Sequence, residues 1–261
     1  MINNNKTELK DKGYTLIPSY FDDSFCDKIN QSLEKSYELC RKIQIENGVD
    51  EITDGTVHHL LATNEKVFFD LLEEITKKEI YNFIKSFFGG NFILNSYGGV
   101  KNLKSKPSYV ANIHRDIRFF SGDFPLMLNM LIMLDDFTLE NGATYLLPES
   151  HLSDENPNYD LFYEKAERAV GKRGDLLFFN SNLWHAAGIN TSDMDRRAIT
   201  ITFTKPFMKQ QLDYPRAVGY DRLETMSDDF KQILGYFSRT PYNLKEWYQK
   251  PENRFYRPDQ D

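Results

Sequence analysis

The sequence Gly174-Asp-Leu-Leu-Phe-Phe-Asn-Ser-Asn-Leu-Trp-His185 contains an apolar run, a turn and a histidine in close succession. The run Asp175–Phe179 predicts a short buried strand, because turn residues bound it on both sides. Similar runs follow one another between residues 92 and 204, a pattern typical of an antiparallel barrel or sandwich. The predicted strands are Phe92–Tyr97, Tyr109–Ile113, Leu126–Leu134, Thr144–Leu147, Asp175–Phe179 and Ala198–Thr204.

Two helical regions precede these strands. Residues Asp22–Lys42 predict an amphipathic helix, with Asp23 or Ser24 as its N-cap. Its apolar positions are Phe25, Ile29, Leu33 and Tyr37. A second stretch, Glu65–Phe88, stops at Gly89-Gly90. The step from Ile75 to Ile80 shifts its apolar stripe, so this stretch can form two helices.

The length of 261 residues fits one β-rich domain with helical additions. Within that single domain, we expect residues 1–90 to form a helical N-terminal elaboration and residues 91–206 to form the β core. Residues 207–261 are rich in aromatic residues, Pro and Arg but show little periodicity. We therefore expect them to pack on the core as a C-terminal extension.

The composition argues against several classes of protein. A net charge of −7 disfavours a general affinity for nucleic acid, which requires a basic surface. The longest apolar stretch, Leu126–Leu134, is far shorter than the roughly 20 residues that a membrane helix needs. Residues 1–13 lack the apolar segment of a secretory signal. The expectation is a cytoplasmic protein with neither a nucleic acid nor a membrane as its partner.

Cys26 and Cys40 are the two cysteines, and both fall on the first predicted helix. Their separation along that helix is about 21 Å at 1.5 Å per residue, whereas the Cα atoms of a disulfide lie within roughly 7 Å of each other. An intrachain disulfide and a zinc–thiolate site are therefore not expected.

A set of metal-binding residue types lies near two of the predicted strands. His114 and Asp116 follow the run Tyr109–Ile113, and in an extended chain residues i and i+2 point to the same side. His185 follows the strand Asp175–Phe179 and supplies a third candidate ligand. Two imidazoles and one carboxylate form the facial triad of non-haem Fe(II) oxygenases, which leaves coordination positions open.

Arginine and asparagine residues are candidates for holding a cosubstrate. Arg196 and Arg197 lie at the entry to the last strand, where either guanidinium could grip a carboxylate, although strand alternation lets only one point inward. Asn129 interrupts an apolar strand and, if buried, needs a polar partner. We treat it as a cosubstrate contact or a core amide, together with Asn112 and Asn102.

Several motifs together resemble the phytanoyl-CoA dioxygenase family of Fe(II)/2-oxoglutarate oxygenases, from about Lys10 to Tyr214. These motifs are Gly13–Pro18, His114-Arg-Asp116, Glu140–His151, Gly174–Phe179, Trp184–Asn190 and Arg196–Ile199. The resemblance implies a mainly β fold with helical additions, a double-stranded β-helix (jelly-roll, cupin-like barrel) flanked by N-terminal helices. It also implies Fe(II) on His114, Asp116 and His185, and 2-oxoglutarate held by Arg196, with Arg197 as the fallback. Relatives often carry Ser where this chain has Ala187, so one cosubstrate contact is lost or replaced.

The implied activity is oxidation, typically hydroxylation, of a C–H bond in a small metabolite, with O₂ consumed and succinate and CO₂ released. Two alternatives are a cupin-type metalloenzyme that needs no cosubstrate and a non-catalytic ligand-binding barrel. Further candidates for the substrate pocket are His58, His59, Phe119 and Phe120, whereas His151 is expected to be a structural hydrogen-bonding residue. The substrate and the oligomeric state are left open by the sequence.

Overall fold

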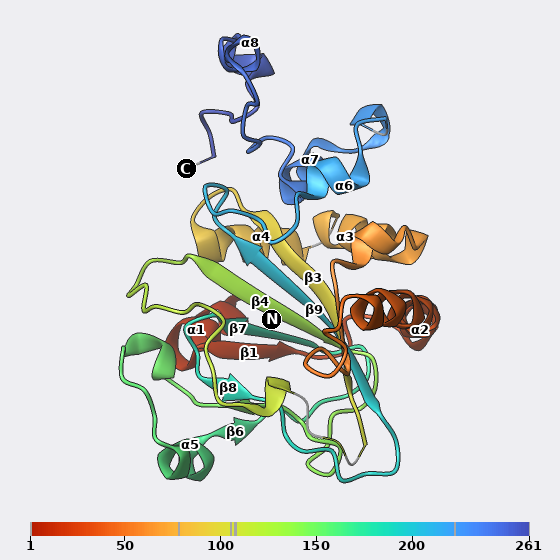
Figure 1. The fold of residues 1–261 in the computed structure, drawn as a ribbon. Helices are drawn as coiled ribbons and strands as arrows, with labels where there is room; N and C mark the ends of the chain where they lie inside the picture. The colour runs from red at the N-terminus through yellow and green to blue at the C-terminus, as the bar shows by residue number, and fades with distance from the viewer. Residues whose placement is uncertain (1, 78, 105, 107–108, 222, 261) are drawn as a thin grey trace.

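Antiparallel strands form two sheets in the computed structural model of the protein, which describes residues 2–77, 79–104, 106, 109–221 and 223–260 (Figure 1). The large sheet has six strands in the order β1-β7-β4-β9-β3-β2, and the small sheet has three in the order β6-β5-β8. The strands of the large sheet are β1 (Tyr14–Ile17), β2 (Thr56–His58), β3 (Ile93–Asn102), β4 (Met127–Met133), β7 (Leu176–Asn180) and β9 (Arg196–Thr204). Those of the small sheet are β5 (Tyr145–Leu146), β6 (Glu167–Arg168) and β8 (His185–Ala186).

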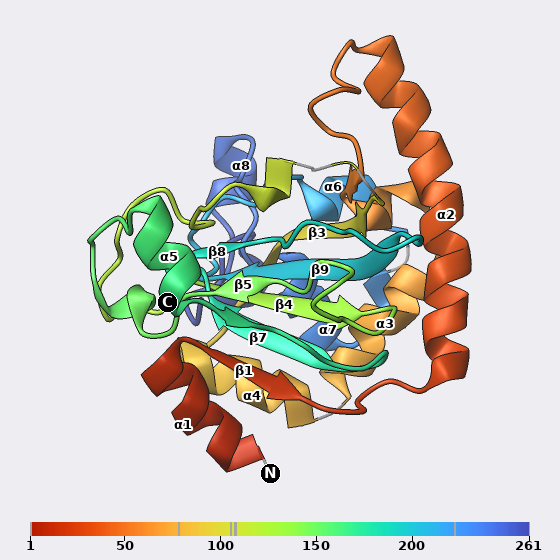
Figure 2. The same ribbon diagram turned by 90° about the horizontal axis from the view of Figure 1, so that it is seen from below.

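Helices flank the sheets and occupy the C-terminal part of the chain (Figures 1 and 2). They are α1 (Ile2–Lys12), α2 (Asp23–Glu46), α3 (Lys66–Thr76), α4 (Glu79–Phe88), α5 (Tyr159–Lys165), α6 (Tyr214–Val218), α7 (Asp228–Leu234) and α8 (Leu244–Trp247). Short 3₁₀ turns are η1 (Leu60–Thr63), η2 (Tyr109–Ala111), η3 (Ser150–Leu152), η4 (Leu223–Thr225) and η5 (Pro251–Asn253). In the described part of the chain, none of these helices has both the length and the apolarity needed to cross a membrane.

The two faces of the large sheet have different neighbours, because alternate residues of each strand point to opposite sides. The face that we call the outer face packs against α2, α3 and α4, and strand residues such as Met130, Phe178 and Ile201 are buried there. The opposite face, the inner face, lies toward the small sheet. Its apolar part contains Leu131, Met133, Leu177, Phe179 and Ala198, packed against residues that include Leu146 and Phe137.

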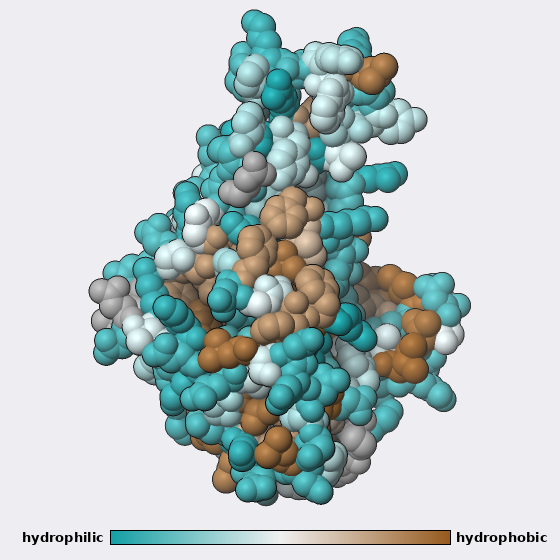
Figure 3. Space-filling model, turned by 90° about the vertical axis from the view of Figure 1, so that its left-hand side faces the viewer, coloured by the Kyte–Doolittle hydropathy of each residue, from teal (hydrophilic) through white to brown (hydrophobic). Residues whose placement is uncertain are grey.

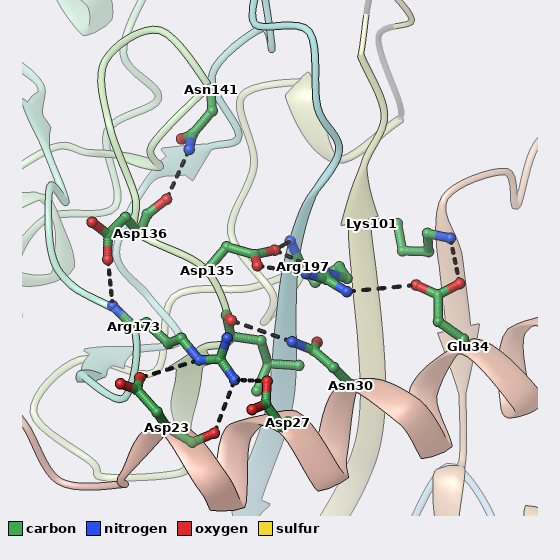
Figure 4. Close-up of polar contacts among 11 residues, drawn as sticks. Asp23, Asp27, Asn30, Glu34, Lys101, Asp135, Asp136, Asn141, Arg173 and Arg197 are labelled. Carbon is green, nitrogen blue, oxygen red and sulfur yellow. Dashed lines mark hydrogen bonds and ion pairs between the residues drawn. The ribbon is translucent and has the colours of Figure 1, made fainter.

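Charged and polar residues on one face of α2 attach this helix to loops and strands at the end of the large sheet (Figure 4). The guanidinium of Arg173 lies against Asp23 and Asp27, and Glu34 accepts a 2.8 Å hydrogen bond from Lys101. The helix begins after Asp22, whose side chain accepts from the backbone N–H of Phe25. The N-cap is therefore Asp22, one residue before the earlier of the two predicted positions, because its carboxylate reaches the free N–H groups of the first turn.

Most predicted elements are confirmed, including the break between α3 and α4. The strand predicted at Tyr109–Ile113 is wrong: the chain forms the 3₁₀ turn η2 and then a single β-bridge, between His114 and His185. The neighbouring strand β8 has only two residues, too few to pair with a full strand. His114 and Asp116 therefore approach each other through a bend and not through strand alternation.

The prediction of antiparallel sheets is confirmed, but the description as mainly β underestimates the helices. Helices hold more of the described residues than strands do, so the class is mixed α/β with packed antiparallel sheets. The polar N-terminal segment forms α1, and α7 packs against β3 and α3. The face in Figure 3 is largely hydrophilic with apolar residues gathered near its middle, and the region around α8 carries exposed aromatic side chains such as Tyr242 and Tyr248.

Candidate metal centre

His114, Asp116 and His185 lie together beside β8, the edge strand of the small sheet. One ligand atom from each lies within 4.8 Å of the others. His114 Nε2 is 3.6 Å from Asp116 Oδ1, and His185 Nε2 is 3.8 Å from Asp116 Oδ2. The β-bridge brings the histidines together, because the backbone groups of His114 and His185 exchange two hydrogen bonds of 3.0 Å. Their ring centroids are consequently only 4.2 Å apart.

Both imidazoles are oriented by a backbone carbonyl two residues earlier in the chain. His114 Nδ1 lies 2.7 Å from the carbonyl oxygen of Asn112, and His185 Nδ1 lies 3.0 Å from that of Leu183. Because a carbonyl can only accept a hydrogen bond, Nδ1 carries the proton and Nε2 presents its lone pair. Such a bond to the second ring nitrogen is the usual support for a metal-binding histidine.

Asp116 is held by a chain of hydrogen bonds from the large sheet. Asn129 Nδ2 donates to Asp116 Oδ2 at 2.7 Å and to Ser181 Oγ at 3.0 Å. Thr202 Oγ1 donates in turn to Asn129 Oδ1 at 2.8 Å. Asn129 is buried, and these contacts satisfy both its carbonyl oxygen and its amide nitrogen. This amide therefore fixes the orientation of the carboxylate.

Burial keeps the imidazole of His185 neutral. Desolvation, and to a smaller extent the neighbouring His114, lower the pKa of His185 to about 4, although Asp116 opposes the shift. A neutral imidazole is the form that binds a metal. His114 is half-buried and Asp116 is exposed, so the cluster opens to solvent on one side. The N, N, O donor set with an open side suits a ferrous ion that must also bind other ligands.

Arg196 lies on the inner face and is only 3% exposed. Its guanidinium stacks over the ring of Phe137 at 3.9 Å, and its Nε and Nη1 have no hydrogen-bond partner among the described residues. Burial lowers the pKa of Arg196 to about 9, which leaves it charged at neutral pH. A buried cation without a carboxylate is costly, so this side chain fits an incoming anionic ligand.

Arg197 points to the outer face, where it is engaged in the structural contacts of Figure 4. It donates to Asp135 from Nε at 2.9 Å and from Nη2 at 2.7 Å. This ion pair raises the pKa of Arg197. The expected alternation of the two arginines is therefore present, with Arg196 on the inner face.

The other predicted candidates are dispersed. Asn112 contributes its carbonyl to His114 while its side chain is exposed, and Asn102 Nδ2 donates to the carbonyl of Gly188 at 2.9 Å. The ring of His59 lies 3.1 Å from the hydroxyl of Tyr214. His151 Nε2 bonds to the carbonyl of Lys10, as expected for a structural residue.

The three remaining candidates for the substrate pocket, His58, Phe119 and Phe120, lie in different parts of the structure. His58 is the last residue of β2 and lies on the inner face, opposite Gly98. Phe119 is exposed, and Phe120 lies beside Arg115, with 5.7 Å between its ring centroid and the guanidinium carbon. His58 is thus the candidate of this group that the strand register places on the same side as Arg196.

Sequence reasoning missed Ser181 and Thr202 as partners of Asn129. Thr202 shares the strand phase of Arg196, so the period of two along β9 was a signal that could have identified it. Ser181 falls in the turn after β7, where no periodicity marks a side chain as inward.

Comparisons with known proteins add to these observations. The sequence profile of the family described as phytanoyl-CoA dioxygenase (PhyH) matches residues 9–198. An uncharacterized protein of Mycobacterium tuberculosis is 31% identical over 258 residues, which cover 95% of this chain and 92% of that protein. The dioxygenase cdmA of Talaromyces verruculosus is 27% identical over 262 residues, which cover 92% of this chain and 85% of that enzyme.

A solved structure has a similar fold. The crystal structure of AviO1 from Streptomyces viridochromogenes Tue57 matches with a TM-score of 0.60 and covers 80% of this chain and 97% of its own. The sequence identity is 18%, so this likeness concerns the fold alone.

Proposed function

Because the chain belongs to the phytanoyl-CoA dioxygenase (PhyH) family, we propose that it is an Fe(II)- and 2-oxoglutarate-dependent oxygenase. It oxidises, typically hydroxylates, a C–H bond of a small metabolite and releases succinate and CO₂. The observation that carries the proposal is the cluster of His114, Asp116 and His185, in which one ligand atom of each residue lies within 4.8 Å of the others and both Nε2 lone pairs are free. Family members with dioxygenase names support the reaction class.

In the proposed enzyme, His114 Nε2, Asp116 and His185 Nε2 would hold the iron, which would supply the oxidative chemistry. The protein's own residues bind and orient. The carbonyls of Asn112 and Leu183 keep the two lone pairs aimed at the metal, and Asn129 holds the carboxylate. The open side of the cluster leaves room for the cosubstrate and for O₂.

Arg196 is the proposed anchor for the distal carboxylate of 2-oxoglutarate. Support comes from its burial, its unpaired Nε and Nη1, and its place on the same face as Thr202, which lies two hydrogen bonds from Asp116. Asn129 and Asn112 are proposed to support ligands of the metal and not to hold the cosubstrate directly, because Asn129 is already satisfied and the side chain of Asn112 is exposed.

We also propose that the two sheets form the double-stranded β-helix, or jelly-roll, of this family. Support comes from the apolar core that they share on the inner face and from the bridge between His114 and His185. A single domain over residues 1–261 is supported by one apolar cluster that extends from Leu9 in α1 to Tyr236 after α7.

Succinate formation tests the proposed function. Protein prepared without oxygen is given Fe(II) and 2-oxoglutarate, then O₂, with and without candidate metabolites. Turnover should require both iron and 2-oxoglutarate, and His114→Ala or Asp116→Ala should abolish it. His59→Asn is the matched control, because the ring of His59 is directed toward Tyr214. Oxygen consumption that needs iron but not 2-oxoglutarate would favour the cosubstrate-independent cupin alternative, and iron binding without any turnover would favour the binding barrel.

A further inference from the structure

The inner face carries a row of polar residues beside the candidate metal centre. Strand pairing places His58 opposite Gly98, and Gly98 opposite Thr200, across β2, β3 and β9. In the adjacent row, Ser96 lies opposite Thr202. Residues directly opposite each other in antiparallel strands project from the same face. We call His58, Ser96, Thr200 and Thr202 the polar strip, and Thr202 connects it to Asp116 through Asn129.

The polar strip is accessible to solvent. Ser96, Thr200 and Thr202 are partly exposed and His58 is exposed, whereas Ile199 and Ile201, on the outer face of the same strand, are completely buried. β3 and β9 are not edge strands, since each has a neighbour on both sides. Exposure in the middle of the sheet therefore means that the inner face is uncovered at these positions.

Gly98 lies at the centre of the polar strip, between His58 and Thr200. A Cβ atom on Gly98 would lie 2.7 Å from the carbonyl oxygen of Val57, 3.2 Å from Thr200 Oγ1 and 3.6 Å from His58 Nδ1, so only glycine fits here. Because residue 98 has no side chain, none separates the ring nitrogen of His58 from the hydroxyl of Thr200. The hydroxyls of Ser96 and Thr200 have no hydrogen-bond partner within the described ranges, and the contact of His58 Nε2 with the Tyr109 hydroxyl is 3.5 Å, at the limit for a hydrogen bond.

The polar strip carries no net charge. His58 is accessible to solvent, but the protein around its ring partly desolvates it, which lowers the pKa of His58 and keeps its imidazole neutral at pH 7. Among the described inner-face positions of β2, β3 and β9, Arg196 is the one permanently charged residue. It lies four residues from Thr200, about 13 Å along the strand. Carboxylates and phosphates are usually bound by Arg or Lys, and the strip offers neither.

We propose that His58, Ser96 and Thr200 recognise the primary substrate, and that this substrate presents uncharged hydrogen-bonding groups, hydroxyl or carbonyl, to them. The inference rests on the proposed function and names the substrate class of the same site. A neutral imidazole and a hydroxyl can each donate and accept, so they suit hydroxyl groups, which also do both. Such a site discriminates strongly against analogues that lack the polar group, because its own groups are then left unpaired.

The first test compares substrate classes. The iron-loaded protein with 2-oxoglutarate is mixed with three sets of probes: neutral alcohols, polyols and lactones; aliphatic carboxylates; and acyl-CoA thioesters. We expect at least one neutral hydroxylated or carbonyl compound to accelerate succinate formation tenfold or more, with no comparable effect from the other sets. Acceleration confined to carboxylates or thioesters, or none by any neutral compound, overturns the inference.

The second test examines the residues, using the most active neutral compound. His58→Leu and Thr200→Val remove the two flanking polar groups with little change in volume, and each should raise the KM of that compound about tenfold or more while kcat changes less. His59→Asn is the control: this ring contacts Tyr214, and Asn tolerates the left-handed backbone at φ 60°. An unchanged KM in both variants, or an equal rise in the control, overturns the assignment.

A spectroscopic measurement separates this inference from the proposed function. Ferrous iron and 2-oxoglutarate bound together give a weak visible charge-transfer band without any substrate. If the wild-type protein shows neither this band nor succinate formation, the proposed function itself fails. A normal band in the wild type and in both variants, together with a preference for acidic probes, removes only the proposal about the polar strip.

Discussion

Arg196 and Arg197 are consecutive residues on β9, but they face opposite sides of the large sheet and differ in their partners. Arg197 forms a two-pronged contact with Asp135, at 2.7 and 2.9 Å. The Nε and Nη1 atoms of Arg196 are buried without a partner in the described part of the chain. One arginine thus stabilises the fold, and the other holds a charge available to a ligand.

Replacing Arg196 with Met should stabilise the ligand-free protein and abolish its response to 2-oxoglutarate. An uncompensated buried charge is costly, so an apolar side chain of similar volume should raise the free energy of unfolding; replacing whole buried ion pairs with apolar residues often adds about 1–4 kcal/mol. In the wild type, 2-oxoglutarate at 100 times its Kd should add about 2.7 kcal/mol to the free energy of unfolding. Urea unfolding with and without 2-oxoglutarate measures both effects. If 2-oxoglutarate raises the free energy of unfolding of Arg196→Met as much as that of the wild type, other residues hold the cosubstrate.

Replacing Arg197 with Met should have the opposite result. Asp135 would lose two charge-assisted hydrogen bonds, so the free energy of unfolding should fall by about 1–3 kcal/mol. The added stability from 2-oxoglutarate should remain, because Arg197 lies on the outer face. The same urea titrations measure both quantities. If Arg197→Met instead loses the response to 2-oxoglutarate and Arg196→Met keeps it, the phase of β9 is shifted by one residue and Arg197 faces inward.

The alternation of Arg196 and Arg197 and the closeness of His114 to Asp116 could be predicted because they depend on local sequence patterns, whereas the choice of Arg196 as the inward residue came from the family resemblance. Strand alternation separates Arg196 from Arg197, and the short spacing of His114 and Asp116 keeps these side chains close in either a strand or a bend. The turn η2 was not predictable, since the segment Tyr109–Ile113 has the composition of a strand and lacks only a long neighbour to pair with. That neighbour is determined by tertiary structure.

The role of Asn129 illustrates a second limit. Its position within the apolar strand β4 indicated a buried amide that needs partners. The partners themselves, Asp116, Ser181 and Thr202, come from two loops and another strand. No pattern within β4 specifies them, so the sequence left the choice between a cosubstrate contact and a core amide open.

Asn129→Ala should weaken iron binding about 10- to 100-fold, the usual effect of removing a hydrogen bond that orients a metal ligand. Without this bond, the carboxylate of Asp116 loses its fixed orientation. Anaerobic titration with Fe(II), or with Co(II) followed by visible absorption, measures the Kd. The control is Asn30→Ala, which removes a buried amide on α2 that bonds to the carbonyl of Leu134. The control variant should be less stable than the wild type but should bind the metal with the wild-type Kd. If both variants have the same Kd for the metal, Asn129 does not position Asp116.

His151 should make the stability of the metal-free protein fall as the pH decreases below neutrality. Its Nε2–H donates to the carbonyl of Lys10 at 2.9 Å, while Nδ1 is buried without a partner among the described residues. Burial therefore lowers the pKa of His151 in the folded protein below the value of about 6.5 in the unfolded chain. The unfolded state binds the proton more readily than the folded state does. The contribution of neutral His151 to the free energy of unfolding is therefore complete above pH 6.5. It is lost as the pH falls toward the folded-state pKa, by at most about 1.4 kcal/mol per pH unit.

The variant His151→Gln keeps an N–H donor but cannot titrate. Its free energy of unfolding, measured at pH 7.5, 6.5 and 5.5, should decrease less steeply than that of the wild type, and parallel curves would show that His151 is not a source of the acid sensitivity.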